Sequence, residues 1–178
     1  MHWLNEHISL HSLIWLFIVT FMIHDFEEII FVERWMNKNH ASARLALPKP
    51  LRRRFDSFRN ITSSQFAVAV ALEFIIFIPT TIMAADFHYF LLFIGFNAIL
   101  LIHVFTHLFQ VFFLRMYTPG VVTAVFVTLP YSVYLFYRLA EIGVLNWSLF
   151  LNSLNVGLIL LPLVIFGHII AKRIIPNQ

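Results

Sequence analysis

The sequence reads LHSLIWLFIVTFMIHDFEEIIF over residues 10–31, an apolar stretch that ends among polar side chains. A run of about 20 apolar residues is long enough to cross the hydrocarbon core of a bilayer as a helix. The segment from His24 to Glu28 contains one histidine and three acids, and a carboxylate that faces lipid is costly. The stretch therefore predicts a membrane-spanning helix that carries a site.

The composition is that of an integral membrane protein. Of the 178 residues, 60% are hydrophobic, 12% are charged and 21 are phenylalanine, and the mean hydropathy is +0.83. The chain has no cysteine, which excludes disulfides, thiolate nucleophiles and metal centres with cysteine ligands. Any metal site must therefore be built from histidines and carboxylates.

The apolar runs predict an all-α fold, a polytopic transmembrane bundle of about five helices in a single membrane domain, 1–178. The predicted spans are 10–31, 61–84, 87–114, 121–139 and 147–170. Short cytoplasmic loops are enriched in Lys and Arg, and every basic residue except Arg138 falls on the side of the basic loop at 34–60. This distribution predicts the N-terminus outside and the C-terminus inside.

Two connections between the predicted spans carry local signals. Residues 117–120, Tyr-Thr-Pro-Gly, are typical of a tight turn, which makes the third and fourth spans an antiparallel hairpin. In the basic loop, leucines and phenylalanines alternate with Arg and Lys, so part of it is expected either at the membrane interface or in a simple positive-inside loop. Topology accounts for the charge, and no nucleic-acid partner is expected.

Two predicted helices each place potential metal ligands on one face. His24, Glu27 and Glu28 are related as i, i+3 and i+4, so they project from one face of the first span. His103 and His107 on the third span are one helical turn apart. This is the spacing with which two histidines on a helix bind one metal ion.

Other polar side chains lie at similar predicted depths in the cytoplasmic half. At 1.5 Å per residue, Glu27 and Glu28 are roughly 10 Å from the cytoplasmic Arg34, while Glu73 is deeper and His168 shallower. Several unpaired acids in the membrane would cost on the order of 10 kcal/mol, which a shared cation or shared protons would offset. A metal site, a proton or ion pathway and a structural network all remain open.

The string His24-x-x-Glu27-Glu28 resembles the HXXEE domain family of small bacterial membrane proteins, which is named for this motif. Later features also look like that family: Asn97-Ala98 followed by His103 and His107, Tyr117-x-Pro119-Gly120, and Gly167-His168. The resemblance implies a multi-pass protein of the bacterial inner membrane and reinforces His24, Glu27 and Glu28. The activity of the family is undefined, so the resemblance implies no substrate.

These patterns favour a metal-dependent enzyme, first of all a hydrolase, which acts on a lipid-like or lipidated substrate that enters from the membrane lipids. The expected ligands are His24, His103 and His107, with Glu27 or Glu28 as the fourth and the other glutamate as general base. Zinc is the favoured cofactor and iron the alternative.

Two alternatives share these residues. Glu28, Glu73 and His168 would complete a second metal site in a di-iron type lipid oxidoreductase, because HxxE gives the same one-turn adjacency as ExxH. A transporter would use the same acids and histidines as a relay for protons or metal ions, although no internal repeat is visible.

Overall fold

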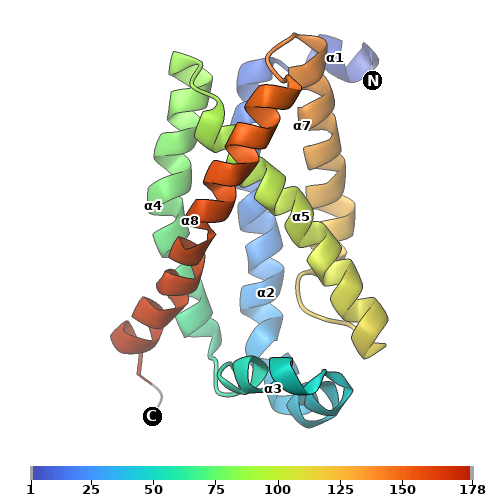
Figure 1. Cartoon of the computed structure of the whole chain (residues 1–178), viewed down its shortest axis with the longest axis vertical. Helices are drawn as coiled ribbons and strands as arrows, with labels where there is room; N and C mark the ends of the chain where they lie inside the picture. Colours follow the sequence, from blue (N-terminus) through green and yellow to red (C-terminus); the bar gives the residue numbers. More distant parts are fainter. Residues whose placement is uncertain (1, 177–178) are drawn as a thin grey trace.

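The computed structural model describes residues 2–176, with side chains described for all of these except residues 2 and 163–165. Its elements are α1 (His2–His7), α2 (Leu10–Ala46), α3 (Lys49–Asp56), α4 (Ser63–Phe87), α5 (Leu91–Leu114), α6 (Val121–Thr123), the π-helical segment η1 (Ala124–Thr128), α7 (Leu129–Glu141) and α8 (Trp147–Ile174). Within the described residues the chain is helical and contains no strand (Figure 1). The predicted all-α fold is confirmed.

Among residues 2–176, four helical segments are long and apolar enough to cross a membrane. They are α4, α5, the continuous run α6–η1–α7 (Val121–Glu141) and α8, and they support the prediction of a membrane protein. The first predicted span lies in α2, which is not one of these four. However, α2 runs along the bundle against α4 and α7 (Figure 1). Its polar residues at 24–28 lie near the middle of this 37-residue helix. The orientation in the membrane stays a prediction.

The basic segment predicted as a loop at 34–60 is largely helical. The helix predicted to end at residue 31 continues to Ala46, because neither glycine nor proline occurs before Pro48 to end it. Pro48 and Pro50 then begin α3, where their fixed φ is compatible with a helix start. Arg44 Nε donates to both carboxylate oxygens of Asp56 at 2.8 and 2.9 Å, so the end of α2 is tied to the end of α3. As a result, α3 lies across one end of the bundle (Figure 1).

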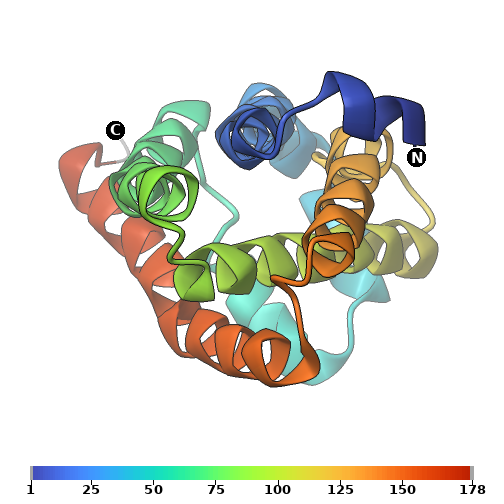
Figure 2. The same cartoon turned by 90° about the horizontal axis from the view of Figure 1, so that it is seen from above.

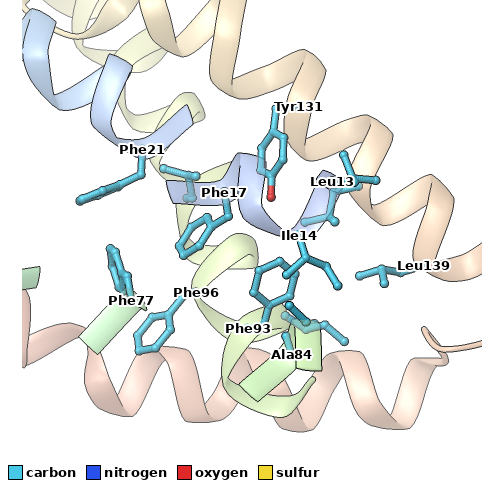
Figure 3. Packing of buried hydrophobic residues seen from close by; sticks show 14 of the residues in the cluster. Leu13, Ile14, Phe17, Phe21, Phe77, Ala84, Phe93, Phe96, Tyr131 and Leu139 are labelled. Atoms are coloured by element: carbon cyan, nitrogen blue, oxygen red, sulfur yellow. The ribbon is translucent and has the colours of Figure 1, made fainter. Parts of the chain in front are cut away.

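The hydrophobic core lies in the half of the bundle that contains the start of α2. Phe17 packs against Phe77 of α4 and Phe93 of α5, with ring centroids 5.3 and 5.6 Å apart (Figure 3). These rings, together with Phe21 and Phe96, hold α2, α4 and α5 together immediately above the polar residues of α2. The site therefore lies at the edge of a rigid aromatic core.

The helices are arranged around an oblique α5. Viewed from above, α2 lies between α4 and α7, α5 crosses on the opposite side, and α8 packs against α5 (Figure 2). The α5–α8 crossing depends on glycine, because a Cβ on Gly95 would lie 2.4 Å from the backbone oxygen of Ser153. This crossing directs the C-terminal half of α5 toward the middle of α2.

Candidate metal centre

Two helices bring four potential ligands together. His24 and Glu28 come from α2, His103 and His107 come from α5, and one ligand atom of each lies within 4.8 Å of the others. His107 Nε2 is 2.9 Å from His103 Nε2 and 3.2 Å from Glu28 Oε1. His103 Nε2 is 4.0 Å from the same Glu28 oxygen. The one-turn pairs of the two helices therefore face each other, and we call these four residues the His/Glu group.

The spacing and chemistry of the His/Glu group fit a metal ion. A tetrahedral zinc ion with bonds of about 2.0–2.1 Å holds its ligand atoms about 3.3 Å apart. The distances from His107 Nε2 to His103 Nε2 and to Glu28 Oε1 are close to this value, whereas His103 Nε2 and Glu28 Oε1 are farther apart at 4.0 Å. Three imidazoles and a carboxylate are also ligands that zinc and iron accept. Nε2 of His24 is buried and has no hydrogen-bond partner among the described residues. The group could therefore hold a metal ion.

Glu27 lies outside the His/Glu group because its carboxylate points toward the start of α6. It accepts hydrogen bonds from the Tyr117 hydroxyl at 2.7 Å, the Thr123 hydroxyl at 2.6 Å, and the backbone N–H groups of Thr123 at 2.7 Å and Val122 at 3.4 Å. The first N–H groups of a helix lack partners within it, and a carboxylate there stabilises the helix. Burial and the hydrogen bond to Glu27 raise the pKa of Tyr117, so its hydroxyl remains a donor.

Thr123 connects Glu27 to the His/Glu group. Its hydroxyl has a single proton, which it donates to Glu27 Oε2, because an ionised carboxylate only accepts. His24 Nδ1, 3.1 Å from the same hydroxyl oxygen, must then be the protonated ring nitrogen. The other ring nitrogen, Nε2, keeps its lone pair. Glu27 and Thr123 thus fix the tautomer of His24 in which Nε2 can bind a metal ion.

The turn before α6 packs directly on the His/Glu group. Gly120 has a φ of +90°, and a Cβ at this position would lie 2.5 Å from His107 Cε1 and 2.9 Å from Glu28 Oε1. Only glycine meets both the backbone and the space requirement. Tyr117, in the same turn, also accepts a hydrogen bond on its carbonyl oxygen from Trp35 Nε1 of α2.

A protein family described as a protein of unknown function with HXXEE motif matches the chain over residues 15–135. The chain belongs to the HXXEE family. The resemblance seen in the sequence is thereby confirmed. The matched segment includes the His/Glu group, Thr123 and Gly120, whereas His168 lies beyond its end. No curated protein and no solved structure matches the chain.

The HXXEE motif also borders a cavity of about 470 Å³, here called the central cavity, which lies between α2, α4, α5 and α8. Its polar lining residues are His24, Asp25, Glu28, Arg54, Glu73, His103, Gln110 and His168. Glu73 on α4 and His168 on α8 were predicted as metal ligands, and they line this cavity without joining the His/Glu group. The ring of His168 packs instead against Phe66, with centroids 5.0 Å apart.

The sequence pattern assigned no role to three residues in or near the site, namely Asp25, Tyr117 and Thr123. Asp25 lines the central cavity, and its Oδ2 is buried without a hydrogen-bond partner among the described residues. Its position in the polar segment 24–28 is the sequence feature that could have identified it as a site residue. Tyr117 and Thr123 contact Glu27 from 90 and 96 residues away. No local pattern in the sequence pairs them with the motif.

Proposed function

We propose that this HXXEE protein is a membrane-embedded, metal-dependent hydrolase. In this proposal His24, His103 and His107 bind one divalent transition metal ion, with zinc preferred to iron. The observation that carries the proposal is the convergence of ligand atoms from α2 and α5 within 4.8 Å of one another beside the central cavity. Three protein ligands leave a coordination position for water or substrate, which is typical of catalytic rather than structural zinc.

Glu28 is the general base of the proposed reaction. It lines the central cavity and lies beside the imidazoles, whereas both oxygens of Glu27 accept hydrogen bonds elsewhere. A bound zinc ion supplies a Lewis acid and makes water more acidic. Glu28 takes the proton of the attacking water and passes it to the leaving group.

The lining of the central cavity favours a lipid-like or lipidated substrate. Six phenylalanines contribute to its wall: Phe17, Phe21, Phe58, Phe66, Phe77 and Phe96. A mostly apolar cavity with a few convergent polar groups is typical of a site for an apolar ligand. An acyl or prenyl chain enclosed by these rings would place an attached ester or amide beside Glu28.

A di-metal lipid oxidoreductase is the second candidate. Two further carboxylates, Asp25 and Glu73, line the same cavity, and His168 lies on its α8 wall. Di-iron carboxylate bundles combine ligands of this kind from several helices. The number of metal ions per chain separates the two candidates.

Elemental analysis of detergent-purified protein tests the proposal. We expect about one zinc ion per chain, lost on dialysis against a chelator and regained when Zn²⁺ is added. About two iron ions per chain would favour the oxidoreductase. Protein that contains no metal and takes up neither Zn²⁺ nor Fe²⁺ would contradict both functions.

The Thr123→Val variant is expected to bind Zn²⁺ roughly 10- to 100-fold more weakly, because groups that orient metal ligands contribute by this amount. Valine keeps the shape of threonine but loses the hydroxyl that accepts from His24 Nδ1. Thr123→Ser keeps the hydroxyl and is expected to bind normally. Zinc competition titration measures the affinities, and ¹⁵N NMR of the histidine rings reports the tautomer of His24. Unchanged affinity and tautomer in Thr123→Val would remove Thr123 from the site.

A further inference from the structure

A second cavity, of about 330 Å³, lies between α3 and the C-terminal end of α5. We call it the entry groove. Its lining residues are Leu47, Leu51, Arg54, Phe55, Phe58, Phe109, Gln110, Phe113 and Leu114. Three of these, Arg54, Phe58 and Gln110, also line the central cavity, so the two spaces meet at this junction.

The polar lining of the entry groove is confined to its junction with the central cavity. Every lining residue except Arg54 and Gln110 is apolar. Side chains at the mouth are open to the surroundings, with Leu51 51%, Phe109 63% and Phe113 39% exposed. The groove therefore suits a hydrocarbon chain whose polar end stops at the junction.

The guanidinium of Arg54 is available to a ligand. It has no hydrogen bond or ion pair with any residue that the structure describes. In contrast, Arg44 pairs with Asp56, and Arg52 donates to the backbone oxygens of Leu45 and Leu47. Arg53 is also exposed and unpaired among the described residues, but it does not line the groove. Arg54 is therefore a free positive charge where the two cavities meet.

The position of α3 matches the boundary between lipid chains and headgroups. This helix lies across one end of the bundle, and it carries apolar residues as well as consecutive arginines (Figure 1). Amphipathic helices of this kind lie in the interface plane of a membrane. In that position Arg54 would lie at headgroup level, and the mouth of the groove would face acyl chains.

We infer that the entry groove binds an anionic phospholipid, with an acyl chain in the groove and the phosphate on Arg54 and Gln110. A guanidinium binds phosphate through two parallel hydrogen bonds, and an amide adds a donor. Asp25, Glu28 and Glu73 line the central cavity and oppose deeper entry of the phosphate. The ester bonds of such a lipid adjoin its phosphate, which would lie where the groove meets the central cavity lined by His24, Glu28 and His103. This inference therefore names a substrate class for the proposed hydrolase and rests on that function.

Lipid affinity tests the inference in nanodiscs made of phosphatidylcholine. Phosphatidic acid and diacylglycerol with the same chains are titrated in, and bound lipid is counted by native mass spectrometry. Arg54→Gln is expected to weaken phosphatidic acid binding roughly tenfold, the effect of losing one charge-assisted interaction, and to leave diacylglycerol unchanged. Arg53→Gln is the matched control, since Arg53 is exposed on the same helix but does not line the groove. Equal losses in both variants would overturn the inference.

The place of the acyl chain is tested with phosphatidic acid that carries a photoreactive group on one chain. Crosslinks are expected within residues 47–58 and 109–114. Crosslinks spread evenly over the apolar surface would contradict binding of the acyl chain in the entry groove. Both experiments use protein with and without a chelator. Protein that binds metal but has no site at Arg54 overturns this inference alone. Protein that binds the lipid at Arg54 but takes up no metal overturns the proposed hydrolase instead.

Discussion

The His107→Ala variant is expected to purify with less than about a tenth of the wild-type metal, whereas His168→Ala retains all of it. His107 is buried, and its Nε2 lies within 3.2 Å of both His103 Nε2 and Glu28 Oε1. Loss of groups that only orient a ligand weakens metal binding roughly 10- to 100-fold, so loss of a direct ligand should reach at least the upper end of that range.

His168 is the control for His107. Both imidazoles are at least partly buried among the helices, but His168 lies on α8 against the Phe66 ring and outside the His/Glu group. Elemental analysis gives the metal content, and circular dichroism checks that both variants remain helical. Equal metal loss in the two variants would place His168 among the ligands and support the di-metal alternative. Full retention by His107→Ala would contradict the metal centre.

Residue spacing was enough to predict which faces of α2 and α5 carry ligands. Side chains three and four residues apart share one side of a helix whatever surrounds it, and this applies to His24 with Glu28 and to His103 with His107. Spacing could not separate Glu27 from Glu28. Adjacent residues point about 100° apart on a helix. Which of the two carboxylates faces the imidazoles depends on where α5 and the segment 117–123 pack against α2.

Predicted depth in the membrane was not enough to decide whether Glu73 and His168 join the His/Glu group. The rise along a helix gives the level of a residue in the membrane, but it does not give the direction of its side chain or the neighbours of its helix. Both residues border the central cavity from α4 and α8, across from the His/Glu group on α2 and α5. The crossing of α5 and α8 at Gly95 and Gly157, which sets this separation, is a property of packing between helices far apart in sequence.

The hydropathy pattern also did not predict where α2 ends. The apolar run ends near residue 31, yet α2 continues to Ala46 through a polar segment. Membrane thickness limits how much of a helix is apolar, but it does not end the helix. No proline or glycine interrupts this segment before Pro48, and α2 ends directly before it.

Gly120→Ala is expected to abolish metal binding by displacing two members of the His/Glu group at once. The new Cβ would lie 2.5 Å from His107 Cε1 and 2.9 Å from Glu28 Oε1, closer than unbonded atoms approach. Metal sites require ligand distances within about 0.2 Å of their proper values, so a shift that relieves this clash removes the site. Elemental analysis is expected to find less than about a tenth of the wild-type metal, as for loss of a ligand.

Gly143→Ala separates the clash from backbone strain. Gly143 also has a positive φ, +74°, but nothing lies within 4 Å of the place that a Cβ would occupy, so alanine there is strained without a collision. A left-handed backbone costs alanine about 1–2 kcal/mol, and both variants should therefore unfold at lower temperature. Only Gly120→Ala should lose metal, because only Gly120 touches the ligands. If the two variants lose metal equally, the loss comes from general destabilisation, and the 117–120 turn does not shape the site.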